Sequence, residues 1–168
     1  MGHRLGLVAR DLLGVDPPAD LIERMVEAYH SAWMGGLALM PGAIEILEGL
    51  KAEHRMALIT DFSPAPGLWQ ILNRFGLERY FQTVIISEDI GHTKPHPSIF
   101  HAALDNLGAS PSECVFVGDN LVCDIQGARQ AGMLPVLLDV DDLHPEHDGE
   151  RICDLRELPP LLRQLGKS

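Results

Sequence analysis

The sequence predicts an α/β fold in which a parallel sheet lies between two layers of helices. From residue 43 onward, short apolar runs alternate with segments whose apolar residues recur at helical spacing. Strands that are buried on both faces are continuous apolar runs, and their alternation with helices is typical of parallel sheets. The 168 residues are enough for one domain with a buried core.

The N-terminal part of the chain predicts two helices and no strand. Apolar residues recur at helical spacing in two runs, which are separated by Gly14 and by Pro17-Pro18. The glycine pair Gly35-Gly36 predicts a hinge. We therefore expect residues 1–38 to form a small helical unit and residues 39–168 to form the α/β core.

The core elements follow from the apolar runs and from the glycines and prolines that bound them. The expected helices cover residues 43–51, 66–75, 97–107, 121–131 and 155–165, and the expected strands cover residues 55–60, 83–87, 114–117, 134–138 and 152–153. Glycines 76, 108 and 132 follow three of the helices, where a left-handed residue commonly ends a helix. The last strand is short, which is typical of a sheet edge.

Composition excludes several classes of partner. The formal net charge of −11 disfavours binding to nucleic acid or to an anionic membrane. Three cysteines form no Cys-x-x-Cys motif and leave an odd count, so a disulfide framework is not expected. The sequence shows no apolar run of membrane-spanning length and no signal-peptide pattern. We expect a cytoplasmic protein.

Polar residues lie just beyond the carboxyl ends of three predicted strands. Thr60 and Asp61 follow the first strand, Lys94 lies in a proline-rich segment after the second, and Asp119 and Asp124 follow the third. Open α/β sheets bind ligands at these ends of their strands. A hydroxyl group and an ammonium group suit a phosphate, and two carboxylates suit Mg²⁺. The sequence therefore predicts a phosphate and metal site here.

Each of these residues also has a plainer interpretation. Thr60 can cap the helix that follows it, and Lys94 can be a surface lysine before a proline. Asp119 can be the N-cap of the next helix, with Asp124 exposed in its first turn. The three segments follow three successive predicted strands of one parallel sheet, and this order favours a shared ligand site.

Histidines provide a second candidate metal site. His92, His96 and His101 surround the lysine segment, and His144 and His147 lie in an acidic stretch near the C-terminus. Imidazole and carboxylate groups can together bind Zn²⁺ or Mn²⁺. The spacings match no standard zinc motif, so solvated loops are the favoured interpretation.

The three polar segments resemble motifs of the haloacid dehalogenase-like (HAD) hydrolases, a large group made up mostly of phosphatases. Thr60 is similar to the phosphate-binding Ser/Thr of that family, Lys94 to its phosphate-orienting lysine, and Asp119 and Asp124 to its acidic pair. The resemblance covers roughly residues 40–165. It implies a three-layer Rossmann-like core with a partial N-terminal helical cap, and Mg²⁺-dependent hydrolysis of a small phosphorylated substrate.

The sequence departs from the family pattern in two places. Asp61 stands where the family often has asparagine, which adds a negative charge beside the expected phosphate. No Asp-x-Asp-Gly-Thr motif occurs, although in the family this motif provides the nucleophile and the acid/base. Residues 7–11 can be aligned with it, placing Ala9 at the nucleophile and Asp11 at the acid/base, but their apolar spacing favours a helix.

The resemblance leaves two functions open. One is a hydrolase in which Asp119 and Asp124 hold Mg²⁺, or else Mn²⁺ or Zn²⁺, and a metal-activated water replaces the aspartate nucleophile. Lys94, with Thr60 and Asp61, would bind the phosphate, and such an enzyme is expected to be weak or promiscuous. The alternative is a truncated, catalytically inactive domain that acts by binding, or an incomplete gene product.

The absent motif also has a structural consequence. In the family its strand lies in the middle of the sheet, between the strands that here end at Thr60 and Val117. Without it, two inner strand edges lack partners, which is costly when they are buried. We expect these strands to pair directly, or a partner segment to fill the gap in a symmetric or swapped homodimer.

Overall fold

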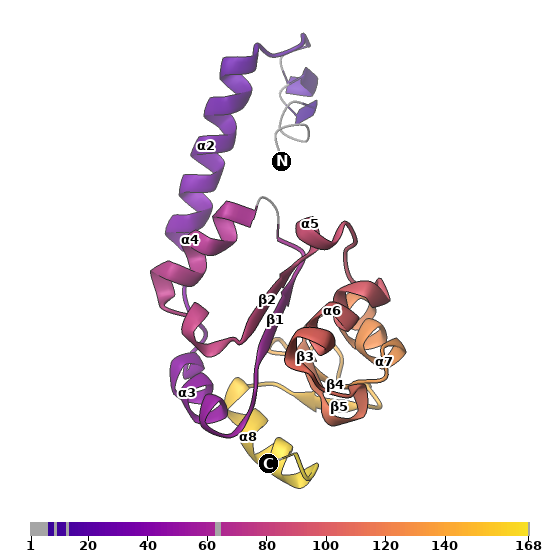
Figure 1. Ribbon diagram of the computed structural model, residues 1–168. Helices are drawn as coiled ribbons and strands as arrows, with labels where there is room; N and C mark the ends of the chain where they lie inside the picture. The colour runs from indigo at the N-terminus through magenta and orange to yellow at the C-terminus, as the bar shows by residue number, and fades with distance from the viewer. Residues whose placement is uncertain (1–6, 9, 13, 63–64, 168) are drawn as a thin grey trace. The chain divides into compact units, whose positions relative to one another are not determined.

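The computed structural model describes residues 7–8, 10–12, 14–62 and 65–167 (Figure 1). The chain divides into two compact units, Met1–Leu39 and Met40–Ser168. In the described part of the chain, no helix is long and apolar enough to cross a membrane.

The first unit is helical. Residues 7–8 and 10–12 are helical, and α2 runs from Ala19 to Gly36. The alternative interpretation of residues 7–11 as a strand is therefore wrong, although Ala9 itself lies outside the described residues. The two glycines that predicted a hinge are the last two residues of α2, which ends at Gly36.

The second unit alternates helices and strands in the predicted order. Its elements are α3 (Ala43–Glu53), β1 (Ala57–Thr60), α4 (Ala65–Phe75), η1 (Glu78–Tyr80), β2 (Thr83–Ile86), α5 (Ser87–Ile90), α6 (Pro97–Leu107), η2 (Pro111–Glu113), β3 (Val115–Gly118), η3 (Leu121–Gln126), α7 (Gly127–Gln130), β4 (Leu134–Leu138), β5 (Glu150–Ile152), η4 (Leu155–Glu157) and α8 (Leu158–Gln164). The ends of α6 and β4 coincide with the sequence-based prediction. The helix predicted at 121–131 differs, because η3 is a π-helix that gives way to the short α7.

Among the described residues, the strands form two parallel sheets that are not hydrogen-bonded to each other (Figure 1). One sheet pairs β1 with β2, and the other has the order β3-β4-β5. Direct pairing of β1 with β3, one of the two expected ways to close the gap, is therefore wrong for the described residues. All strand pairs are parallel, so within each sheet the carboxyl ends lie at the same edge.

Helices cover both faces of these sheets. On one face, α6 and α7 form a buried cluster that includes Ile99 and Phe100, and Ile59 of β1 and Phe116 of β3 pack against it. On the opposite face, Leu50 of α3 lies in a cluster with α8, β3 and β4, while α4 covers β1 and β2 through a third cluster. The predicted three-layer α/β fold is confirmed.

The same helix layers reach strands of both sheets. The α6 cluster contacts β1 and β3, and the α3 cluster contacts Met56, which precedes β1, as well as β3. All four residues of each of these strands are half-buried, whereas the middle of β4 is fully buried. The open edges of β1 and β3 therefore lie between helices that already cover both faces.

Two helical glycines are predicted to respond oppositely to alanine. A methyl group at Gly127 would lie 2.7 Å from Phe100 Cζ and 3.1 Å from Pro95 Cα, whereas nothing lies within 4 Å of one at Gly49. We expect Gly127→Ala to destabilise the fold by about 1–3 kcal/mol through overpacking. Gly49→Ala should stabilise it by about 0.5–1 kcal/mol through helix propensity. Urea unfolding measures both, and equal effects would contradict the close α6–α7 packing.

Candidate active site

An ion pair between Lys94 and Asp124 lies at the centre of the candidate site. Lys94 Nζ donates to Asp124 Oδ1 at 2.7 Å, and the two side chains are only 14% and 4% exposed. The ammonium group also lies 5.9 Å from the centre of the Phe116 ring, within cation–π range. The segment before α6 thus places Lys94 against Asp124 in the segment that follows β3.

The Asp124 carboxylate is held from both sides. Its second oxygen, Oδ2, accepts a hydrogen bond of 3.0 Å from the backbone N–H of Asn120. Gly118 leaves room for it, since a methyl group there would lie 2.5 Å from Asp124 Cβ and Cγ. Asp124 is therefore buried, with one hydrogen-bond partner at each oxygen, and its interpretation as an exposed helix residue is wrong.

Asp119 is exposed, and in the described part of the chain its carboxylate has no hydrogen bond or ion pair. The N-cap of η3 is its neighbour Asn120, whose Oδ1 accepts from Val122 N at 3.0 Å and from Cys123 N at 2.8 Å. The capping interpretation of Asp119 is therefore wrong. Its carboxylate is available to a ligand, which the sequence alone did not establish.

Asp61 connects the end of β1 to the lysine segment. Its Oδ1 accepts a hydrogen bond of 3.0 Å from the backbone N–H of Lys94. Thr60, the last residue of β1, is half-buried beside it. Lys94 is thus tied to β1 through its backbone and to the segment after β3 through its side chain. The sequence pattern did not predict this second role of Asp61.

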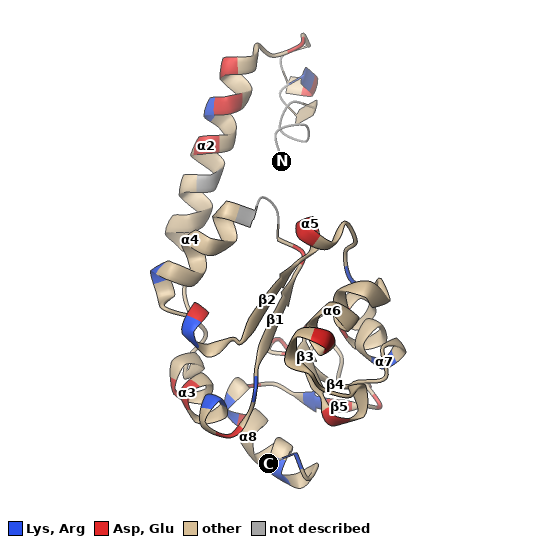
Figure 2. Ribbon diagram, viewed as in Figure 1, with Lys and Arg blue, Asp and Glu red and all other residues tan. Residues whose placement is uncertain are grey.

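The residues present fit Mg²⁺ better than Zn²⁺. Mg²⁺ is commonly held by one or two carboxylates and keeps several waters, whereas a zinc site uses three or four protein ligands. Among the described residues, no group of three or more His, Cys, Asp or Glu side chains could hold a metal ion. Figure 2 shows Asp and Glu spread over both units. Asp119 and Asp124 remain the predicted metal pair.

The histidine-based metal site does not form among the described residues. His92 and His96 stack face to face, with ring centroids 3.8 Å apart and planes at 6°. His96 also caps α6, where its Nδ1 accepts from Ser98 N at 3.3 Å. These contacts account for His92 and His96 through packing and capping, and His101 is exposed on α6.

The acidic stretch after β4 contains an Asp-x-Asp triplet at residues 139–141 that is not available for catalysis. Both oxygens of the buried Asp139 are occupied, by the backbone N–H groups of Leu143 and His144 and by Arg151 Nε. Burial acts to raise the Asp139 pKa, but these donors outweigh it and hold the pKa below its ordinary value. This aspartate therefore fixes the loop rather than a ligand.

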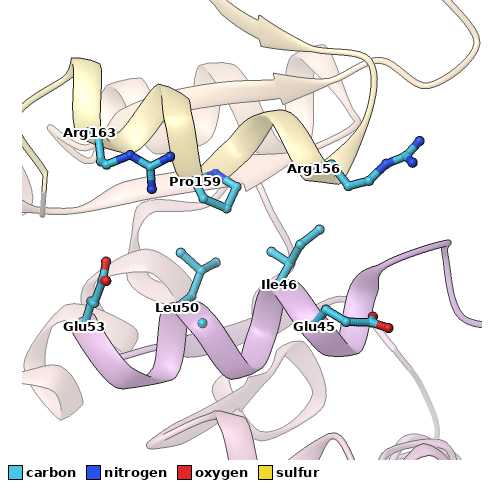
Figure 3. Close-up of a pocket in the computed structure, with 8 residues that line it drawn as sticks. Glu45, Ile46, Leu50, Glu53, Arg156, Pro159 and Arg163 are labelled. Atoms are coloured by element: carbon cyan, nitrogen blue, oxygen red, sulfur yellow. The ribbon is translucent and has the colours of Figure 1, made fainter.

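A cavity of 270 Å³ lies between α3 and the C-terminal helices η4 and α8 (Figure 3). It has an apolar floor and a charged rim, and its lining residues are Glu45, Ile46, Gly49, Leu50, Glu53, Arg156, Pro159 and Arg163. None of the predicted site residues lines it. The candidate active site is thus the surface at the carboxyl ends of β1 and β3, and not this cavity.

The two aspartates are predicted to differ in their effect on stability. Asp124→Asn removes the charge that compensates the largely buried Lys94, so we expect a loss of about 2 kcal/mol, below the fully buried range because Lys94 keeps some solvent contact. Asp119→Asn should change the free energy of unfolding by less than about 0.5 kcal/mol. Urea unfolding at neutral pH compares them, and equal losses would contradict the ion pair.

Comparison with known proteins supports the resemblance. A family model for haloacid dehalogenase-like hydrolases matches residues 9–132. A glyceraldehyde 3-phosphate phosphatase of Methanopyrus kandleri is 36% identical over 163 residues, which cover 92% of this chain and 70% of that protein. One from Pyrococcus furiosus is 38% identical over 146 residues, covering 84% of this chain and 60% of that protein.

Solved structures show the same fold. The HAD phosphatase of Thermococcus onnurineus superposes with a TM-score of 0.71 at 28% identity, covering 91% of this chain and 68% of its own. A putative HAD-hydrolase from Bacillus subtilis, solved with bound magnesium, gives a TM-score of 0.81 at 23% identity and covers 96% and 70%. The phosphatase names agree with the expected phosphoric-ester hydrolase. The family-model match over residues 9–132 and the 36% identical relative show that this chain belongs to the haloacid dehalogenase-like hydrolase family.

Proposed function

We propose that this chain is a Mg²⁺-dependent phosphatase that acts on small phosphate esters. The observation that carries the proposal is the ion pair between Lys94 and Asp124. Asp124 follows Asp119 by five residues, and the carboxylate of Asp119 is exposed and has no partner among the described residues. This arrangement provides a positive charge for a phosphate and a free carboxylate for a metal at the same sheet end. We include a cytoplasmic location in the proposal.

Each residue has a proposed role in the reaction. The Lys94 ammonium neutralises charge on the phosphoryl group, and Asp124 fixes the direction of that ammonium. The Thr60 hydroxyl and nearby backbone N–H groups bind a phosphoryl oxygen. Asp119 and Asp124 would hold the metal. A bound Mg²⁺ ion supplies Lewis acidity and a more acidic water molecule.

The proposed reaction does not include an aspartyl-phosphate intermediate. The sequence contains no Asp-x-Asp-Gly-Thr motif, and the Asp-x-Asp triplet after β4 has its first carboxylate fully occupied. A water molecule is then the nucleophile, and low or promiscuous activity is expected. Mn²⁺ or Zn²⁺ can be tested in place of Mg²⁺.

The relatives point to small phosphorylated sugars as substrates. Several are named glyceraldehyde 3-phosphate phosphatase, and one from Halopiger xanaduensis is named ribulose-1,5-bisphosphate 5-phosphatase. The chain spans 70% and 60% of the two phosphatases compared above, so transfer of their substrate is part of this proposal. We also propose that the helical unit, residues 1–38, is a partial cap.

We predict that phosphate release from glyceraldehyde 3-phosphate requires Mg²⁺, Asp119 and Lys94. Asp119→Asn and Lys94→Ala should each lower kcat/KM by about 100-fold or more, because each removes a charge that stabilises the transition state. Asp105→Asn, on an exposed position of α6, and Lys51→Ala are the matched controls and should retain activity.

Two results would contradict this function. Activity that survives both Asp119→Asn and Lys94→Ala would show that another site, or a contaminant, is responsible. A folded wild-type chain that binds Mg²⁺ but releases no phosphate from any ester would favour the alternative, a non-catalytic domain that acts by binding.

We also propose that the chain forms a homodimer through the open edges of β1 and β3. Each is an apolar strand of four residues whose inner edge is unpaired in the described part of the chain, and helices cover both of its faces. A segment of a second copy would fill the gap between these two edges in a symmetric or swapped dimer.

This assembly predicts a concentration-dependent dimer with protected strand edges. Light scattering should report twice the chain mass of 18.4 kDa, and amide exchange in β1 and β3 should accelerate on dilution to monomer. Exchange in β4, which is paired on both edges within one chain, is the internal control. A monomer at all concentrations with rapidly exchanging β1 and β3 amides would refute the proposal.

A further inference from the structure

We infer that Asn120 is a positioning residue that orients Asp124 and, through it, Lys94. The catalytic consequence rests on the proposed function, whereas the orientation itself is a property of the fold. Asn120 lies between the two predicted metal carboxylates in the sequence and is itself exposed. It is not one of the motif residues that resemble the family's phosphate and metal site.

Three groups of Asn120 act on the same turn of chain. Its side-chain Oδ1 accepts from the backbone N–H groups of Val122 and Cys123, at 3.0 and 2.8 Å. Its backbone carbonyl accepts from Asp124 N at 2.9 Å and from Ile125 N at 3.1 Å. Its backbone N–H donates to Asp124 Oδ2 at 3.0 Å. The cap, the π-helix start and the carboxylate contact are therefore set by one residue.

This arrangement gives the two oxygens of Asp124 different partners. Oδ2 is held by the Asn120 N–H, which leaves Oδ1 for the Lys94 ammonium at 2.7 Å. Rotation of this carboxylate would break both hydrogen bonds, so the Asn120 contact favours one direction for the ammonium group that Asp124 holds. The cap oxygen keeps the Asn120 backbone in the extended conformation, with φ −101° and ψ 119°, in which its N–H makes this contact.

The alternative hypothesis, that Asn120 only stabilises the start of η3, predicts a different result. If Asn120 only terminates η3, its loss lowers stability but leaves the Lys94–Asp124 pair unchanged. Serine is also a good N-cap and retains a neutral acceptor, whereas alanine has none. Asn120→Ser and Asn120→Ala therefore separate the loss of the acceptor from other effects of substitution at this position.

The direct test is the ammonium signal of Lys94 in a ¹H–¹⁵N NMR spectrum of the apo protein. An ion-paired, poorly exposed ammonium exchanges its protons slowly and gives a visible signal, which the Lys94→Ala spectrum identifies. We expect the signal in wild type and in Asn120→Ser, and its loss in Asn120→Ala. Asn106→Ala is the control, since Asn106 donates to Thr83 Oγ1 at an exposed position elsewhere. All spectra are recorded on variants shown to be folded.

The functional consequence is tested separately with inorganic phosphate as the probe. In the presence of Mg²⁺, Asn120→Ala should bind phosphate about 10-fold more weakly than wild type, and Asn120→Ser within about 2-fold, as expected for one charge-assisted hydrogen bond. Isothermal titration measures both affinities.

The results distinguish the orientation of Asp124 by Asn120 from its consequence for phosphate binding. A Lys94 signal that persists in folded Asn120→Ala overturns the positioning role, whatever the activity. A signal lost in Asn120→Ala and kept in Asn120→Ser supports the role even if wild type fails to bind phosphate, which would instead contradict the proposed function. Loss of the signal in Asn120→Ser as well would show that the cap oxygen is not what positions Asp124.

Discussion

The ion pair between Lys94 and Asp124 is the constraint on which the site depends. It joins residues 30 positions apart in the chain and places a charge pair where little solvent reaches. Burying two charges is costly unless their remaining hydrogen-bonding capacity is satisfied. The Asn120 N–H, the space left by Gly118 and the face of Phe116 provide that compensation. The surrounding residues are thus constrained by the pair even where no ligand would touch them.

The charge of the whole chain adds to the importance of Lys94. A net charge of −11 repels a phosphorylated substrate at long range, so attraction has to be generated locally. Of the groups gathered at the candidate site, the lysine ammonium is the cation, and Asp61, Asp119 and Asp124 are carboxylates. A bound divalent ion would offset part of this excess. This balance gives a physical reason for expecting phosphate binding and metal binding to depend on each other.

The sequence predicted most of the secondary structure, and three of the residues that it proposed for the site, Asp61, Lys94 and Asp124, are in contact in the structure. Apolar runs located the buried strands, and Pro97 and Gly108 marked both ends of α6. The π-helix was missed because apolar spacing over ten residues does not distinguish i+4 from i+5 hydrogen bonds. Asn120 was missed because Asp119, directly before it, is an equally good capping residue. The separation of the two sheets was also missed, since strand pairing is set by contacts distant in sequence.

The π-helix has a consequence for how this site tolerates changes in chain length. A π turn contains one residue more than the α turn it replaces, and η3 covers residues 121–126, which include Asp124. Removing a residue from 121–123 would let the segment close as an ordinary α-helix. Each residue of an α-helix turns the chain by about 100°, so the deletion would rotate Asp124 about the helix axis relative to Lys94. The site would tolerate the deletion only if the Asp124 carboxylate still faced Lys94. Insertions and deletions at residues 121–123 therefore test the position of Asp124 more directly than most point substitutions around the site.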